Sequence, residues 1–505
     1  MLAKIHSIAV VGVEGIPITV EVDIANGLPS FTTVGLPDGS VRESKDRVKS
    51  AIINSGYKFP SRRITVNLAP GDLKKEGTAF DLPIALGLLA AGEIIPQQSL
   101  DRYAIVGELS LDGSVRPVRG TLPIACSTLN NGLKGLILPQ ENAEEAALIK
   151  NLDILPVEKL YEIVEILSGR QPMVFFHAKV KPLAPPSYST DFSDIKGLGN
   201  AKRALEIAAS GMHNVLLKGP PGAGKTLIAK ALPSILPDLN NEEKLETSKI
   251  YSVLDYNNRD SALVLCRPFR APHHTISDAG LIGGGTIPRP GEVSLAHNGV
   301  LFLDELPEFK KHVLEVLRQP VEDGLVTIAR AQTSITFPSR FMLVAAMNPC
   351  PCGFYGDRVN ECHCNDLQIR RYLSRISGPL LDRIDMNLEI AGIKFKQLNG
   401  LEKGDSSSQI RDRVNKTRKV QERRFQKFPG IHANGLMGAK EIDQICRICD
   451  KSRMLLEKSV QRLGLSARAY HRILKISRTI ADMENSENIL FQHVAEAVQF
   501  RRSAA

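Results

Sequence analysis

The sequence contains no tryptophan, and aromatic residues make up only 5% of its 505 positions. Base stacking on exposed aromatic side chains is therefore not visibly supported. The chain also lacks an apolar run long enough to span a bilayer, and its first residues do not follow a signal-peptide pattern. Only eight cysteines occur, which does not indicate a disulfide framework in a chain of this size. These absences predict a cytoplasmic protein that does not associate with membranes.

Composition and charge set wide limits on function. Apolar residues form 43% of the chain and charged residues 24%, so an ordinary hydrophobic core can form. The length is sufficient for about three domains. A formal net charge of +9 is compatible with a polyanionic partner but modest for this length. A basic protein without a nucleic-acid role is equally compatible with that charge.

The patterning changes along the chain in a way that predicts separate domains. Alternating apolar residues in 18–24 and 64–68 predict half-buried strands, and 82–91 has the pattern of a buried helix. A stretch rich in proline and lysine over 179–186 is the best linker candidate. After about Gln409 the pattern is helical, including 440–463 and 467–483. The expected parts are an α+β domain over 1–170, a linker over 171–190, an α/β core over 191–395 and a helical domain over 396–505.

The most informative motif is a glycine-rich stretch between an apolar strand pattern and a helical pattern. It fits G-x-x-x-x-G-K-[ST], the phosphate-cradling loop of nucleoside triphosphatases. Its glycines let backbone N–H groups approach phosphate oxygens, and the following helix N-terminus favours negative charge. Lys225 can reach the β- and γ-phosphates, and the Thr226 hydroxyl can ligate Mg²⁺. The residues expected to bind ATP are Gly219, Pro220, Pro221, Gly222, Ala223, Gly224, Lys225 and Thr226.

A second nucleotide motif follows 79 residues after Lys225, where the apolar run 299–303 delivers two adjacent carboxylates. Asp304 can hold Mg²⁺ through water, and Glu305 can orient and activate the attacking water. An apolar strand that ends in two acids occurs often by chance. Its pairing with the phosphate loop favours an ATPase site.

Three further polar residues are candidates for this site. Asn348 ends the apolar run 341–347 and could hydrogen-bond the γ-phosphate or the lytic water, although a turn residue before a proline is the simpler alternative. Arg383 is a candidate arginine finger, which would stabilise transition-state charge from a neighbouring subunit. Arg468 could contact the γ-phosphate. An isolated arginine is more often a solvated surface residue, so both assignments depend on order and context.

Four cysteines lie close together in the sequence directly after Asn348. Cys350 and Cys352 form one C-x-C pair, and Cys362 and Cys364 form another. Four thiolates on a short loop that contains glycine predict a tetrahedral structural Zn²⁺ site. Reduced thiols or a redox-sensitive pair are the alternatives, because C-x-C is a less standard spacing than C-x-x-C.

The order of these elements resembles that of the AAA+ ATPases. The stretches 267–277, 283–285 and 290–309 narrow the resemblance to the magnesium-chelatase-like branch and, within it, to the competence protein ComM family. The resemblance covers essentially the whole chain and implies a P-loop NTPase core with a helical lid. It also implies a hexameric ring with ATP and Mg²⁺ at subunit interfaces, in which Arg383 and Arg468 act on a neighbour's nucleotide.

Residues 60–145 resemble the proteolytic domain of the Lon family, which has a ribosomal S5 domain 2-like fold. The best stretch is Lys75–Pro83, but the position of the serine nucleophile holds Ala79. In a gap-free reading, the position of the partner lysine holds Ile124. A Ser–Lys dyad needs both side chains, so protease activity is not expected. The expected role is structural or nucleic-acid-binding.

The ComM resemblance implies a DNA helicase that drives branch migration while incoming DNA is recombined in natural transformation. Its partners would be single-stranded or branched DNA and further copies of the same chain. A basic segment is consistent with DNA binding and equally with a solvated lid helix. Its cations are Arg411, Arg413, Lys416, Arg418, Lys419, Arg423, Arg424 and Lys427. A chelatase-like metal-insertion motor and a protein-remodelling ATPase are the alternative functions.

Overall fold

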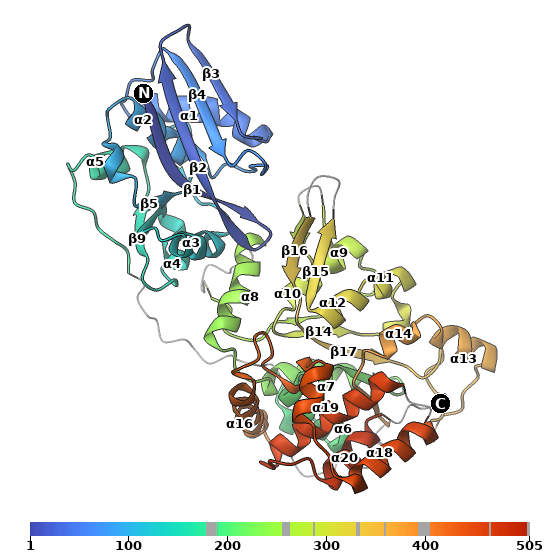
Figure 1. Ribbon diagram of the computed structural model, residues 1–505. Helices are drawn as coiled ribbons and strands as arrows, with labels where there is room; N and C mark the ends of the chain where they lie inside the picture. The colour runs from blue at the N-terminus through green and yellow to red at the C-terminus, as the bar shows by residue number, and fades with distance from the viewer. Residues whose placement is uncertain are drawn as a thin grey trace. The chain divides into compact units, whose positions relative to one another are not determined.

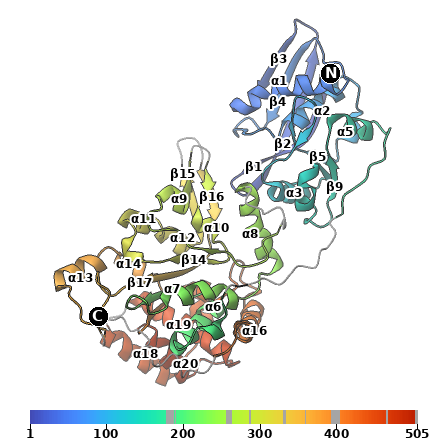
Figure 2. The same cartoon turned by 180° about the vertical axis from the view of Figure 1, so that it is seen from behind.

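The computed structural model divides the chain into two compact units, which are drawn in Figures 1 and 2. The residues described are 1–177, 188, 190–254, 263–285, 288–329, 334–357, 360–391, 404–463 and 466–501. The first unit comprises Met1–Ala184 and Lys244–Val264, and the second comprises Pro185–Glu243 and Leu265–Ala505. The proline-rich stretch 179–186 and the expected boundary at 395 lie outside the described residues.

The first unit is a mixed seven-stranded sheet in the order β3-β4-β2-β1-β5-β8-β9. Strands β1, β5, β8 and β9 are parallel, whereas β1, β2 and β4 are antiparallel. The strands are β1 (Leu2–Val11), β2 (Glu14–Ala25), β3 (Ser30–Val34), β4 (Arg63–Ala69), β5 (Tyr103–Ile105), β8 (Gly135–Pro139) and β9 (Asp153–Val157), with a separate small hairpin of β6 (Glu108–Leu109) and β7 (Val115–Arg116).

Both faces of this sheet are covered by helices. The period of two along a strand sends Ile137 of β8 into one apolar cluster and its neighbours Leu136 and Leu138 into another. The first cluster includes side chains of α1 (Gly39–Asn54), α2 (Asp81–Ala91) and α5 (Leu160–Leu167), and the second includes side chains of α3 (Thr121–Asn130) and α4 (Ala143–Ala146). Helix α2 is buried along almost its whole length, which confirms the buried helix predicted over 82–91.

Helix α8 (Asn241–Leu254) begins in the second unit, but its residues from Lys244 onward belong to the first. The carbonyl of Ser252 accepts from the backbone N–H of Gly120 (3.1 Å), and the Ser252 hydroxyl accepts from the backbone N–H of Leu122 (3.3 Å). These bonds satisfy backbone donors at the start of α3. The middle of the chain therefore completes the first unit.

The second unit is built on a five-stranded sheet in which all neighbours are parallel, in the order β11-β14-β17-β10-β18. The strands are β10 (Val215–Lys218), β11 (Phe269–Arg270), β14 (Val300–Leu303), β17 (Met342–Met347) and β18 (Met386–Glu389). Strands β14 and β17 are buried throughout, as expected for a parallel sheet covered on both faces. This arrangement confirms the predicted α/β class.

Helices and two small hairpins surround this sheet. The helices before the C-terminal group are α6 (Gly199–Gly211), α7 (Lys225–Ala231), α9 (Asp278–Ile282), α10 (Glu292–Leu295), α11 (Lys311–Glu315), α12 (Arg318–Asp323), α13 (Asp366–Leu373) and α14 (Gly378–Leu381). One hairpin pairs β12 (Gly283–Gly284) with β13 (Arg289–Pro290), and the other pairs β15 (Leu325–Ala329) with β16 (Ser334–Pro338).

The C-terminal helices gather against α6 on one side of the parallel sheet, as Figure 1 shows. They are α16 (Ser407–Phe425), α17 (Ala439–Ile445), α18 (Asp450–Leu463), α19 (Ala467–Met483) and α20 (Phe491–Gln499). The helical pattern expected over 440–463 is confirmed by α17 and α18, but it is interrupted between them, because α17 ends at Ile445 and α18 begins at Asp450. Between them, Ile448 forms a β-bridge with Ile489, which draws the backbone out of the helix.

A buried polar contact ties these helices to the sheet. His213, two residues before β10, lies 2.8 Å from the Thr479 hydroxyl of α19 through its Nε2 atom. Its Nδ1 atom lies 3.9 Å from the Asp385 carboxylate, just before β18. Complete burial lowers the pKa of His213 to about 4, because burial penalises the charged imidazolium more than Asp385 favours it. His213 is therefore neutral in the folded protein at neutral pH.

This burial predicts a loss of stability in mild acid. Between pH 6.5 and about 4 the unfolded chain binds a proton at His213 that the folded chain does not, so stability falls as the pH falls through this window. The free energy of unfolding should fall by about 3 kcal/mol over this window because of this one group. His213→Gln should flatten the dependence of the melting temperature on pH. Buried His432 remains in both proteins and cancels in the comparison. Equal pH dependence in the two proteins would contradict this role.

Candidate ATPase site

The register of the parallel sheet brings three predicted segments to one edge. Lys218, the last residue of β10, pairs with Met347, the last residue of β17. Leu303 of β14 pairs with Ala345 of the same β17. The residues that follow these strands therefore leave the sheet side by side at its carboxyl edge. In open α/β sheets this edge is where ligands bind, at the point where the strand order reverses.

Lys225 lies in a buried position at the start of α7. Its ammonium donates to the carbonyls of Gly219 (2.7 Å) and Pro220 (2.7 Å) and to Oδ1 of Asn348 (3.1 Å). Burial lowers the pKa of Lys225, and the Asp304 carboxylate opposes that shift. A Cβ at Gly219 would lie 2.2 Å from the Ile390 carbonyl oxygen, so this backbone path requires glycine. The loop thus holds a desolvated cation beside the amide of Asn348.

Thr226 and Asp304 also meet, as the metal assignment predicts. The Thr226 hydroxyl donates to Oδ2 of Asp304 at 2.8 Å, and Oδ1 of Asp304 accepts from the backbone N–H of Glu305 at 3.0 Å. A hydroxyl and a carboxylate oxygen at the N-terminus of a helix are the hard oxygen donors that Mg²⁺ takes in phosphate-binding sites. The residues present therefore fit a magnesium ion with the phosphates of ATP.

Glu305 occupies a strained backbone position next to this site. Its φ of 53° lies in the left-handed region, which a non-glycine residue adopts at a cost of about 1–3 kcal/mol. Its Oε2 atom lies 3.7 Å from Nδ1 of His274, and its side chain is 61% exposed. His274 was not among the residues predicted from the sequence. The sequence feature that could have indicated His274 is the adjacent His273–His274 pair, which follows the edge strand β11.

The two arginines do not lie at the phosphate loop of their own chain. Asn214, the residue before β10, donates from its side-chain amide to the Arg383 carbonyl at 3.0 Å. Arg383 therefore sits near the amino end of β10, whereas the phosphate loop follows the carboxyl end. The four residues of β10 separate these ends by about 13 Å. The Arg383 guanidinium donates to Glu322 and to the carbonyl of Pro379 (2.7 Å).

Arg468 joins Arg383 at the same acid, since its Nη2 atom lies 3.8 Å from Oε1 of Glu322. The pKa of Arg383 is lowered mainly by burial. The positive charges of Arg468, Arg318 and Arg472 lower it further. The guanidinium still carries its charge at neutral pH. Crowded cations of this kind attract a further anion. The structure thus brings the two predicted arginines together, away from the other four catalytic candidates.

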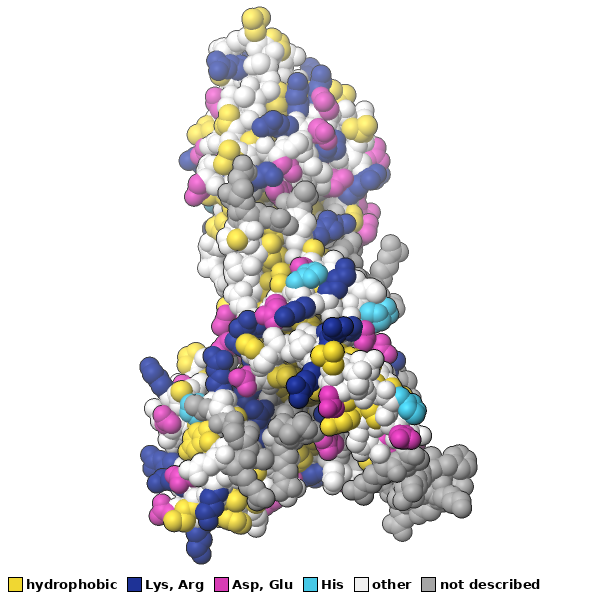
Figure 3. Space-filling model, turned by 90° about the vertical axis from the view of Figure 1, so that its right-hand side faces the viewer, with side chains coloured by type: hydrophobic (Ala, Val, Ile, Leu, Met, Phe, Trp, Pro, Cys, Tyr) yellow, Lys and Arg dark blue, Asp and Glu magenta, His cyan; other side chains and the backbone are white. Residues whose placement is uncertain are grey.

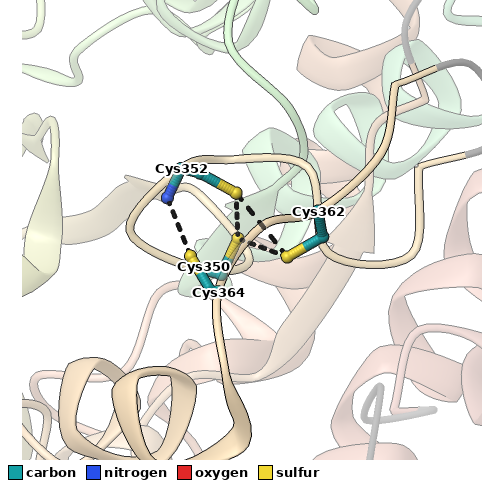
Figure 4. A group of neighbouring side chains, drawn as sticks. All are labelled: Cys350, Cys352, Cys362 and Cys364. Atoms are coloured by element: carbon teal, nitrogen blue, oxygen red, sulfur yellow. Dashed lines mark hydrogen bonds between the residues drawn. The ribbon is translucent and has the colours of Figure 1, made fainter.

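The four predicted cysteines converge, and Figure 4 shows their sulfur atoms turned toward a common centre. All four Sγ atoms lie within 4.8 Å of one another. Cys350 lies 3.3 Å from Cys352 and 3.7 Å from Cys362, and Cys352 lies 3.6 Å from Cys362, between Sγ atoms. A tetrahedral zinc site with bonds of about 2.3 Å has sulfur atoms about 3.8 Å apart. The cluster therefore fits a zinc ion.

The cysteine loop packs directly on the phosphate loop. A Cβ at Gly353, where φ is +89°, would meet Cδ of Pro221 at 2.5 Å and lie 3.8 Å from Cγ of Asn348. Only glycine permits this approach and this backbone conformation. The position of the cysteine loop is thereby linked to that of Asn348 and Pro221.

Two other features predicted from the sequence are the basic segment 411–427 and the residue at the Lon-type lysine position, Ile124. In α16, Arg418 is buried and donates to the Ala209 carbonyl (3.0 Å), while Arg424 donates to buried Asp482. Arg411 and Arg413 form ion pairs, and the exposed cations are Arg413, Lys416, Lys419, Arg423 and Lys427. Two of the eight basic residues of this segment, Arg418 and Arg424, thus serve packing. Ile124 in α3 is a core residue, which suits the absence of a Lon-type dyad.

Comparison with known families covers most of the chain. The family described as magnesium chelatase, subunit ChlI, matches residues 191–398, its C-terminal region matches 404–501, and a further ChlI description matches 20–142. Competence protein ComM of Haemophilus influenzae is 45% identical over 99% of this chain and 97% of that protein. The Escherichia coli protein YifB, described as uncharacterized, has the same identity and coverage. Lon protease of Brucella abortus is 29% identical over 26% of this chain and 17% of that protein.

These matches agree with the two units. The parallel-sheet unit is a magnesium-chelatase-like AAA+ core, and the mixed-sheet unit has Lon-like homology. Among the described helices, none combines the length and apolar character that a bilayer crossing requires.

Proposed function

This chain belongs to the competence protein ComM family of magnesium-chelatase-like AAA+ proteins, and on that premise we propose that it is an ATP-driven, ring-forming DNA motor. The motor acts in the cytoplasm as a helicase that moves branch points while incoming DNA is recombined. The name of its Haemophilus relative supports the link to competence. The contacts of Lys225 and Thr226 with residues from two other strands support ATP hydrolysis.

Each residue of the site has a separate task in hydrolysis. The Lys225 ammonium binds the terminal phosphates and exchanges its carbonyl contacts for phosphate oxygens. Thr226 and Asp304 would hold Mg²⁺, which would neutralise charge on the phosphates. Glu305 orients the attacking water and accepts its proton, and the amide of Asn348 positions the γ-phosphate or that water. Because Asn348 contacts Lys225, both groups can respond to the same phosphate.

The position of the arginines supports a ring. Arg383 and Arg468 share Glu322 near the amino end of β10, whereas the phosphate loop lies at the carboxyl end. An active site that needs an arginine must receive it from another subunit, because its own arginines lie at the other end of the strand. A head-to-tail contact of this kind closes into a ring when the rotation per subunit permits. A hexamer is the proposed form.

The cysteine cluster is proposed to hold one structural Zn²⁺ per chain. Four thiolates leave no open coordination position, so the ion has no catalytic role. Its proposed role is to hold the loop that packs on Pro221 and follows Asn348, which keeps two parts of the nucleotide site in place.

The motor assignment is tested with Lys225→Ala and Glu305→Gln. We expect DNA-stimulated ATP hydrolysis and strand exchange on a three-way junction in the unaltered protein. Both variants should lose them by about 100-fold or more, because each removes a group that acts on the reacting phosphate. Glu305→Gln should still bind nucleotide. If hydrolysis is indifferent to every DNA structure tested, a chelatase-like or protein-remodelling function replaces the motor.

The ring arrangement is tested by mixing two inactive variants. The Arg383→Ala chain keeps an intact phosphate loop, and the Lys225→Ala chain keeps an intact Arg383. In rings formed from equal amounts of both, about a quarter of the interfaces combine the two intact halves. ATP hydrolysis should therefore reappear in the mixture. Hydrolysis that stays at the level of the separate variants, in rings shown to contain both chains, would contradict action between subunits.

Zinc occupancy is tested by metal analysis of the purified protein. We expect about one zinc per chain, and Cys352→Ser should lose it and melt about 5 °C or more below the unaltered protein, since metal binding contributes to folding. Exposed Cys449 lies outside the cluster, so Cys449→Ser is the matched control and should retain the metal. Protein that neither contains nor takes up zinc, with unchanged melting in Cys352→Ser, would exclude the site.

A further inference from the structure

The first unit contains a basic cavity that the ATPase function does not use. It has a volume of about 480 Å³ and lies between the end of α1, the segment before β3 and the segment before β4. Its lining residues are Pro29, Lys49, Ile53, Tyr57, Lys58, Phe59, Pro60 and Ser61. Six of the eight come from one stretch, 53–61, so the site is local to the unit and does not depend on how the two units are arranged.

The cavity has a strong excess of positive charge. Lys49 and Lys58 are exposed, and Arg62 and Arg63 are exposed directly after the lining stretch. No carboxylate is among the lining residues, and within the described part of the chain no salt bridge is recorded for these four cations. Such a group of unneutralised cations is the electrostatic pattern of a phosphate-binding surface.

The acid that acts on the lining residue Tyr57 is already engaged. Burial, and then the Glu165 carboxylate, raise the pKa of the Tyr57 hydroxyl. Glu165 itself pairs with Arg170 at 2.8 Å, so its charge is compensated within the unit. The Tyr57 ring therefore lines the cavity without bringing a free negative charge to it.

An aromatic face accompanies these cations. Phe59 is half-buried. It packs against the core of the unit and also lines the cavity. The Lys49 ammonium lies over the Phe59 ring, 6.0 Å from its centroid. A base that stacks on this face would take the place of the ammonium, and the flexible lysine side chain could then contact the adjoining phosphate. A ring held by the core beside two lysines can stack an unpaired base while the lysines contact the adjoining phosphates. The sequence Lys58-Phe59-Pro60-Ser61-Arg62-Arg63 concentrates both properties.

We propose that this cavity is a binding site for a single DNA strand, in which Lys49 and Lys58 contact phosphates and Phe59 stacks a base. The proposal rests on the DNA motor function and gives the Lon-like unit a role in it. A single strand is favoured over a duplex because stacking on Phe59 requires an unpaired base. Direct lysine contacts to phosphates would add binding that weakens as salt rises.

The experiment measures binding of the full chain to a fluorescent single-stranded oligothymidine over a range of salt concentrations. Each phosphate contact adds about 5-fold in affinity at 0.1 M salt, so Lys49→Glu combined with Lys58→Glu should weaken binding by about 25-fold or more. The slope of log affinity against log salt should fall by about 1.4. Phe59→Leu keeps the apolar packing and should weaken single-strand binding by about 5-fold or more, with little effect on duplex binding.

The matched control is Arg102→Glu combined with Lys150→Glu, which changes the charge equally at two exposed cations of the same unit outside the lining. Basal ATP hydrolysis should be unchanged in all these variants. Equal weakening by the control pair, or unchanged binding in the lysine pair, would overturn the site and leave the motor intact. Equal loss of duplex binding with no effect of Phe59→Leu would overturn the single-strand assignment. If the unaltered protein binds no DNA, the proposed motor function itself fails.

Discussion

The parallel pairing of β10 with β17 and β18 is the constraint on which the rest of the ATPase unit depends. At the carboxyl end of β10, the register sets Gly219 beside Asn348 and lets Lys225 reach across to the neighbouring strand. At the amino end, Asn214 bonds to the backbone of β17 at Leu343 and to the Arg383 carbonyl. One short strand therefore positions two groups of candidate residues, with the phosphate loop at one end and Arg383 at the other.

This separation has an electrostatic consequence. Arg383 and Arg468 share Glu322, and the further arginines around Arg383 oppose its positive charge. The phosphate loop, in contrast, holds Lys225 desolvated among carbonyl oxygens. In the proposed ring, a neighbouring chain would bring its arginines to the phosphate held by the loop, so that hydrolysis would depend on the geometry of the assembly.

The surface of the protein shows why charge patterns in a sequence are weak guides to partners. Helix α16 has the densest run of cations, yet Arg418 and Arg424 are spent on packing against α6 and α19. On the face drawn in Figure 3, basic and acidic side chains are interspersed, without one dominant patch. The cations around Lys58 are fewer, but they surround a cavity without acids. Placement relative to other groups decides what a charge can bind.

The sequence by itself determined the two nucleotide-binding motifs, because the phosphate loop and the acidic pair are local patterns whose strand and helix contexts follow from neighbouring residues. It also predicted the four cysteines, which lie within fifteen positions of one another. Only the tertiary structure decided which groups meet across strands, because register and crossover connections join residues that are distant in the sequence. The contact of Lys225 with Asn348, the sharing of Glu322 by two arginines and the approach of His274 to Glu305 all depend on such pairings.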